Sequence, residues 1–254
     1  MDLELQGRVV LVTGAGQGLG REIGLAFARE GAHVAFGYHS SGPGAEEAAA
    51  EAGRLTGRAL AVQCDLRSDD DVAAAVEAVE AQLGPIDVLV NNAAATAAKP
   101  FLATTPDDWT FQVDVTVTGT LRITQAVAKR MVERQTGVIV SLMGDSGRVG
   151  ESGLSITATT RASTMALTKS LAKELARHGI RANCVSIGLV QTDRFEHHAQ
   201  QPDEERMKKI LAQYPLRRLG VPADVTPLVL LLASPRSSWI TGQVISVNGG
   251  YAMP

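Results

Sequence analysis

A glycine-rich turn near the start of the chain has the residue types and the spacing of a phosphate-binding loop. The turn spans Thr13 to Gly20, follows an apolar run and leads into a stretch with helical periodicity. Glycines let the backbone approach a pyrophosphate closely, and the start of a helix offers free amides and a positive dipole to hold it. A tight structural turn is the alternative, but the position between a strand and a helix favours a dinucleotide site. The candidate binding residues are Gly14, Gly16, Gln17, Gly18, Leu19 and Gly20.

The residues after the second apolar run bear on which dinucleotide would bind. An acidic residue there usually hydrogen-bonds the free ribose hydroxyl of NAD and would repel the phosphate of NADP. The segment from Phe36 to Ser41 contains no carboxylate. The sequence therefore favours NADP(H) over NAD(H), with His39, Ser40 and Ser41 as candidate phosphate partners. A solvent-exposed polar loop is the alternative.

Short apolar runs rich in valine and isoleucine alternate with longer stretches that have helical spacing. This pattern is typical of a parallel sheet covered by helices on both faces, because such strands are buried on both sides. We therefore predict an α/β fold. The predicted strands are Arg8–Val12, His33–Gly37, Ala59–Gln63, Ile86–Val90, Val138–Leu142, Arg181–Ser186 and Val244–Val247.

One segment interrupts this alternation. Residues Asp193 to Leu216 are polar and helix-prone, and they follow the sixth predicted strand. An insertion at the carboxyl side of the sheet is where a lid over a ligand would lie. His197 and His198 in this segment could donate a proton near neutral pH, although solvated surface is the favoured interpretation.

Composition limits the classes of function. The chain has 254 residues, a net charge of -3 and two cysteines, Cys64 and Cys184. The length fits one domain spanning residues 1–254, and the charge gives no basic field for nucleic acid or an anionic membrane. The cysteines are far apart in separate apolar segments, which predicts buried thiols, no metal site and a cytoplasmic location. No apolar run is long enough to span a bilayer.

The whole chain resembles the short-chain dehydrogenase/reductase family, in particular its single-domain branch that includes 3-ketoacyl reductases. The resemblance rests on motifs spread over the full length. These are the turn Thr13 to Gly20, Asp65-Leu66, Asn91-Asn92-Ala93-Ala94, Gly179 to Asn183, Gly188 with Thr192, Trp239 to Gln243, and Asn248-Gly249-Gly250.

The resemblance implies a Rossmann-type, doubly wound sheet of seven parallel strands that binds a nicotinamide dinucleotide. It also implies a tetramer built on two long helices near Thr118–Arg134 and Thr157–Arg177. A small-molecule or acyl-carrier-bound substrate is expected. The further cofactor contacts that it implies are Asp65, Leu66, Asn91, Ala93, Arg161, Gly188 and Thr192.

The family's chemistry depends on an asparagine, a serine, and a tyrosine and lysine one helical turn apart. The register of the surrounding motifs aligns these positions with Thr116, Gly144, Thr157 and Arg161, so all four are expected to be replaced. Threonine is shorter and less acidic than tyrosine, and proton donation by a positioned side chain is typically worth about 10²–10⁴ in rate. Glycine offers no donor, whereas arginine keeps a positive charge near the ribose.

Other residues could substitute as proton donors. Asp145 and Ser146 follow Gly144 on the expected substrate loop, so acid–base chemistry at Asp145 is conceivable, although exposed loop polarity is the favoured interpretation. The chain has three tyrosines, Tyr38, Tyr214 and Tyr251, none of them in the expected catalytic helix.

Three hypotheses for function follow. The first is a dinucleotide-binding subunit that has lost the usual ketone and alcohol chemistry and assembles as a homotetramer or with an active paralogue. The second is an atypical NADP-dependent oxidoreductase of the carbonyl reductase type, or a non-redox enzyme, that uses the replaced set. The third is a sensor of the redox ratio.

Overall fold

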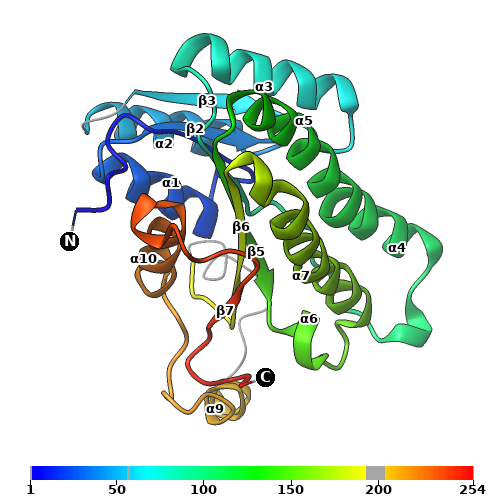
Figure 1. Cartoon of the computed structure of the whole chain (residues 1–254). Coiled ribbons are helices and arrows are strands. Elements are labelled where there is room, and N and C mark those ends of the chain that lie inside the picture. Colours follow the sequence, from blue (N-terminus) through cyan, green and yellow to red (C-terminus); the bar gives the residue numbers. More distant parts are fainter. Residues whose placement is uncertain (1, 56–57, 193–203, 254) are drawn as a thin grey trace.

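Seven parallel strands form one sheet at the centre of the molecule (Figure 1). The computed structural model describes residues 2–55, 58–192 and 204–253. The strand order is β3-β2-β1-β4-β5-β6-β7, and each predicted strand lies within two residues of its observed bounds. The strands are β1 Val9–Val12, β2 His33–Tyr38, β3 Ala59–Gln63, β4 Val88–Asn91, β5 Gly137–Gly144, β6 Ile180–Ile187 and β7 Val244–Val247.

Helices cover both faces of the sheet, which confirms the predicted doubly wound α/β fold. Helices α1, α2 and α10 pack on one face, and α3, α5 and α7 pack on the other, each with its own apolar cluster. The main helices are α1 Gly18–Arg29, α2 Gly42–Gly53, α3 Asp69–Leu83, α4 Pro106–Val113, α5 Gly119–Arg134, α6 Ser146–Val149, α7 Ser155–Leu175, α9 Glu204–Ala212 and α10 Pro222–Ala233.

The order of strands reverses at β1, which lies between β2 and β4. In open parallel sheets a ligand binds in the crevice outside the carboxyl ends of the strands at such a switch point. The glycine-rich turn follows β1 directly, so the topology places it at this crevice.

Local sequence signals set the start of the helices that border the crevice. The Ser68 hydroxyl accepts a hydrogen bond from the Asp71 amide at 3.1 Å and caps α3. Thr105 and Asp108 form a capping box at the start of α4. Both are hydroxyl or carboxylate caps that satisfy amides left without partners in a first turn.

A π-helical segment, η2 Asp114–Thr118, joins α4 to α5. Such segments insert one extra residue per turn and are frequent at functional sites. Here the segment turns the side chain of Thr116 inward, where it is buried.

The described residues test two other expectations. Cys64 and Cys184 are free and buried, as predicted, and burial raises the pKa of both thiols to about 12. Within residues 2–55, 58–192 and 204–253, no helix is both long and apolar enough to cross a membrane. Of the predicted lid over 193–216, residues 193–203 lie outside the described residues, and α9 occupies the next part.

We expect Gly24 to control the fit between α1 and β2. A Cβ at Gly24 would lie 2.3 Å from the buried ring of Phe36, so Gly24→Ala should lower the free energy of unfolding by about 1–3 kcal/mol, as overpacking does. The matched control is Gly53→Ala, because Gly53 also lies in a helix but has no heavy atom within 4 Å of the added Cβ. Denaturant unfolding at fixed protein concentration measures both. Equal stability of the two variants would contradict this account.

Candidate functional site

The glycine-rich turn is fixed to the loop that follows β4. The Thr13 hydroxyl accepts hydrogen bonds from the amides of Asn92 and Ala93, both at 3.1 Å. The Asn92 side chain donates in return to the carbonyls of Thr13 and Gly14 at 3.0 and 3.1 Å. These contacts hold the two loops of the switch point in one arrangement.

Glycine is required at three positions in the turn because another chain segment lies against each one. A Cβ at Gly14 would lie 2.9 Å from Ala93 Cα, and a Cβ at Gly20 would lie 2.4 Å from Asn92 Nδ2. A Cβ at Gly16 would lie 2.1 Å from Ser41 Oγ. Ser41 therefore packs against the turn, which leaves His39 and Ser40 as the side chains of this loop that line the cleft.

Gly18 differs from these three glycines because the space around it is open. Its backbone has φ +56°, a conformation that favours glycine. A Cβ at Gly18 would meet only Thr192, with the hydroxyl oxygen 3.6 Å away. The side chain of the N-cap residue Gln17 makes no capping hydrogen bond to α1. The first amides of α1 are therefore candidates to hold an anion.

A cleft of about 300 Å³ lies beside the turn at the carboxyl ends of β1, β2, β3 and β4. Its walls are partly apolar and carry a few polar side chains, as in small-molecule sites. The glycine turn and the open cleft together fit a dinucleotide, because backbone, helix start and apolar walls are all present. The predicted cofactor residues that line it are Gly14, Gln17, His39, Ser40, Asp65, Leu66 and Ala93.

Other predicted cofactor residues lie outside this cleft. Asn91 is buried, and its side chain donates to Thr124 Oγ1 at 2.9 Å and to Ser141 Oγ at 3.3 Å, so it ties β4 to α5 and β5. Gly188 lies against the ring of Tyr214. Leu19 packs on the apolar cluster of the α1 face, and Thr192 borders a separate hollow with Gly18. The contacts of these residues with a cofactor stay predictions.

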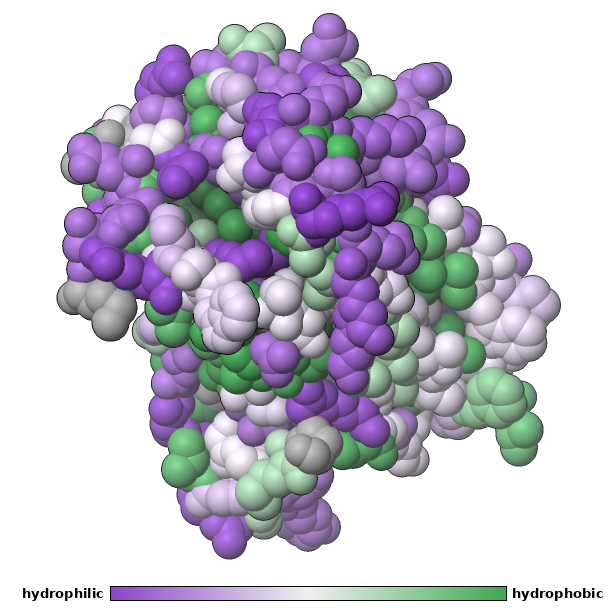
Figure 2. Space-filling model, in the orientation of Figure 1, coloured by the Kyte–Doolittle hydropathy of each residue, from purple (hydrophilic) through white to green (hydrophobic). Residues whose placement is uncertain are grey.

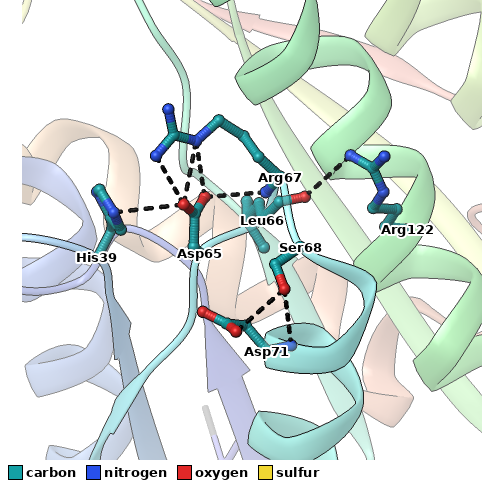
Figure 3. A network of polar contacts seen from close by, with 7 residues as sticks. All are labelled: His39, Asp65, Leu66, Arg67, Ser68, Asp71 and Arg122. Carbon is teal, nitrogen blue, oxygen red and sulfur yellow. Dashed lines mark hydrogen bonds and ion pairs between the residues drawn. The ribbon is translucent and has the colours of Figure 1, made fainter.

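A polar network surrounds Asp65 at one end of the cleft (Figure 3). The Arg67 guanidinium donates to both carboxylate oxygens, with the shortest distance 2.6 Å, and His39 Nε2 lies 3.4 Å from Oδ2. The hydrogen bond from Arg67 is the main reason that the pKa of Asp65 falls to about 2. Asp65 is therefore ionised at neutral pH and already paired.

The Thr157 hydroxyl is buried and engaged by neighbouring residues. Thr157 lies on α7 with 3% of its surface exposed. Its hydroxyl donates to Gln112 Oε1 at 2.6 Å and accepts from the Ala97 amide at 3.4 Å. Gln112 itself is 2% exposed. The hydroxyl hydrogen therefore points at an amide oxygen of the protein.

The other three positions expected from the resemblance have contacts of their own. The Thr116 hydroxyl accepts from the Ala95 amide at 3.0 Å. Gly144 ends β5, and a Cβ there would meet only Ser146 Oγ, at 3.6 Å. Arg161 donates to Thr96 Oγ1 at 3.1 Å, and burial lowers its pKa to about 10, so it stays a cation at neutral pH.

The expectation that Asp145 belongs to an exposed loop is wrong. Asp145 is 2% exposed and Ser146 is 8% exposed. Both carboxylate oxygens of Asp145 accept hydrogen bonds, one from Ser186 Oγ and one from Asn248 Nδ2, each at 2.5 Å. Asp145 therefore joins the end of β5 to β6 and to the loop after β7, which explains a buried carboxylate without acid–base chemistry.

The structure describes two of the remaining candidate proton donors, Tyr214 and Tyr251. The Tyr214 hydroxyl accepts from the Leu189 amide at 2.9 Å, and its ring stacks on Tyr251 with centroids 5.1 Å apart. Burial raises the pKa of both phenols. His197 and His198 lie outside the described residues.

Three residues of the site were not singled out from the sequence. Gln112 lies four residues before Thr116, so its spacing along a helix could have indicated that it lies near the site. Thr96 lies two residues beyond Ala94, so its position directly after a family motif could have done the same. Arg67 follows Asp65 and Leu66 directly. An arginine two residues from a carboxylate has no fixed meaning in a sequence, because only the loop conformation brings the two groups together.

Comparisons with known proteins agree over the full length of the chain. A family model described as enoyl-(acyl carrier protein) reductase matches residues 14–252. Oxidoreductase UcpA of Escherichia coli (strain K12) is 37% identical over 99% of this chain and 97% of its own. The 3-oxoacyl-[acyl-carrier-protein] reductase FabG of Staphylococcus aureus (strain N315) is 35% identical over 96% of this chain and 97% of its own.

A solved structure gives the same result in three dimensions. The short-chain type dehydrogenase/reductase from Mycobacterium marinum superposes with a TM-score of 0.89 and 32% identity, over 100% of this chain and 98% of that one. Its identity and coverage match those of the sequence relatives. With the strand order and the glycine turn described above, these findings show that the chain belongs to the short-chain dehydrogenase/reductase family.

Proposed function

We propose that this protein binds a nicotinamide dinucleotide, NADP(H) in preference to NAD(H), and is impaired in the usual transfer of hydride between ketones and alcohols. It acts as a non-catalytic subunit or partner of an active paralogue. The observation that carries this proposal is the buried Thr157 hydroxyl, which donates to Gln112 Oε1 at 2.6 Å. A hydroxyl held in this way is poorly placed to protonate a substrate.

The four replaced positions remove the groups that would transfer a proton. A bound nicotinamide would supply hydride, and the family resemblance assigns proton donation to a tyrosine where this chain has Thr157. The threonine hydroxyl is a weak acid, and the protein already uses its hydrogen. At Gly144 there is no side chain to stabilise a developing oxyanion, a contribution on the order of 10²–10³ in rate. The effects overlap and do not simply multiply.

Cofactor binding is supported more strongly than catalysis. Gln17 does not cap the start of α1 with its side chain, and Arg161 keeps a positive charge that suits the nicotinamide ribose. The loop after β2 offers His39 and Ser40 to the cleft and contains no carboxylate, which supports NADP(H). The domain is proposed to be single, with the segment 193–216 as a lid over the substrate. A cytoplasmic location fits its two free thiols.

The relatives support a second candidate function. Proteins named oxidoreductase and 3-oxoacyl-[acyl-carrier-protein] reductase match this chain over 96% or more of its length. An acyl-carrier-bound ketone is therefore the substrate class to test first. In this alternative the chain reduces such ketones with an atypical proton donor.

We predict that the protein binds NADPH more tightly than NADH in isothermal calorimetry. Gly18→Val should weaken both by at least about tenfold, because a branched side chain would fill the space between α1 and Thr192. Gly7→Val is the matched control, since Gly7 also has a positive φ, +74°, but has no heavy atom within 4 Å of a Cβ. Equal affinities of wild type and Gly18→Val would argue against the proposed phosphate site.

A restoration variant tests the loss of catalysis. Thr116→Asn, Gly144→Ser, Thr157→Tyr and Arg161→Lys should be combined with Gln112→Leu, which keeps the volume but removes the amide that Thr157 contacts. We expect NADPH-dependent reduction of a 3-oxoacyl thioester to rise by roughly 10²–10⁴.

The control for restoration replaces Thr157 by phenylalanine in the same background. This variant adds the ring without the phenol, so it should show no gain in rate. If the wild-type protein already reduces the thioester as fast as the tyrosine variant, the impaired-subunit proposal fails and the atypical-enzyme alternative stands.

Apolar side chains reach the surface near α4 and α5, on the right of the molecule in the view of Figure 2. Leu102 is 97% exposed, Phe111 is 55% exposed and Leu121 is 46% exposed. These side chains support a tetramer of one chain or a mixed tetramer.

We expect sedimentation velocity to give four times the monomer mass, for the protein alone or mixed with a purified paralogue. Leu121→Lys should lower that mass, because it places a charge on this apolar face. A monomer under both conditions would contradict the partner proposal.

A further inference from the structure

The carboxylate of Asp65 is saturated with donors in this structure. Arg67 alone supplies four contacts: its backbone amide and Nε to Oδ1, both at 2.9 Å, and Nε and Nη2 to Oδ2, at 3.1 and 2.6 Å. His39 Nε2 is 3.4 Å from Oδ2. A carboxylate offers about four lone-pair positions. Asp65 therefore has little capacity left for another donor while Arg67 stays in place.

Arg67 and His39 approach Asp65 from two sides (Figure 3). Both line the cleft together with Ser40, and both are partly open to solvent, with 41% of the Arg67 side chain and 55% of the His39 side chain exposed. Other charges of this loop are paired elsewhere. Asp69 binds Arg122 at 2.8 Å, and Asp71 accepts from Ser68 at 3.0 Å.

We propose that Arg67 selects the phosphorylated cofactor: it leaves Asp65 to bind the 2′-phosphate of NADP(H), beside His39, and so uncovers Asp65 for the amino group of adenine. This inference rests on the proposed dinucleotide site and names the residue that determines its specificity. The reason for the choice is that Arg67 is the only arginine or lysine among the described residues that line the cleft, whereas the loop after β2 contributes only His39 and Ser40 as donors to a phosphate.

The exchange is physically favourable for one cofactor only. Opening the Arg67–Asp65 pair has a cost, because the guanidinium contacts both carboxylate oxygens, but the 41% exposed Arg67 side chain can reach solvent or a second anion when it leaves. A 2′-phosphate carries nearly two negative charges and accepts the forked donors of a guanidinium well. The free ribose hydroxyl of NAD offers no such anion, so Arg67 would stay on Asp65 and keep the adenine contact covered. NADP(H) thus gains two contacts: the Arg67 cation binds its 2′-phosphate, and the Asp65 carboxylate accepts a hydrogen bond from its adenine amino group.

The test uses four probes on the full-length protein: NADPH, NADH, adenosine 2′,5′-bisphosphate and adenosine 5′-monophosphate, each titrated by calorimetry. Arg67→Ala should weaken the two 2′-phosphorylated probes by at least about tenfold. The affinity of the other two should stay unchanged or rise, because Asp65 is then uncovered. Arg67→Lys keeps the charge but loses the fork, so it should give an intermediate loss.

Arg130→Ala is the matched control, because it also removes one positive charge that is paired with a carboxylate, but Arg130 binds Glu80 and does not line the cleft. All four affinities should be unchanged in this variant. An equal loss for all four probes in Arg67→Ala would overturn the inference, since Arg67 would then act on the adenine ring or on the loop. If the wild type binds neither NADPH nor NADH, the dinucleotide site itself fails, and this inference fails with it.

Discussion

The hydrogen bonds of Thr13 are the constraint on which the geometry of the site depends. Its hydroxyl accepts from two consecutive amides after β4, and Asn92 donates back to the turn after β1. These bonds cross the switch point of the sheet, where the two loops would otherwise move independently. They fix the glycine turn, and the turn fixes the start of α1. The hydrogen bonds between the loops after β1 and β4 close the space between these two loops, and the cleft lies beside them.

Much of the fold could be predicted from the sequence, because the strands and helix starts depend on residues that are close together in the chain. Valine-rich runs such as Val138–Leu142 and cap signals such as Thr105 with Asp108 need no knowledge of distant residues. The glycine turn was equally accessible, since its function depends on spacing alone. The surroundings of individual side chains could not be predicted in this way. Asp145 reads as loop polarity, yet it is buried, because its partners Ser186 and Asn248 are brought to it only by the folded sheet.

The same limit applies to the centre of the site. A resemblance to a family identifies Thr157 as the position of interest, but it does not reveal what the hydroxyl touches. Gln112 comes from another helix, α4, which the π-helical segment η2 follows directly. The partner of Thr157 thus depends on helix register, which sequence patterns specify only to within a residue or two.

The space around Gly144 accepts a new side chain more readily than the space around Thr157. The Cβ of a serine at Gly144 would meet one oxygen, Ser146 Oγ, at an ordinary contact distance of 3.6 Å. A tyrosine at Thr157 would first have to displace the buried amide of Gln112. Substitutions at the two positions therefore differ in how much of the surrounding packing must change. The Cβ of the first meets only an ordinary contact, whereas the phenol of the second would require the Gln112 side chain to move or to be replaced.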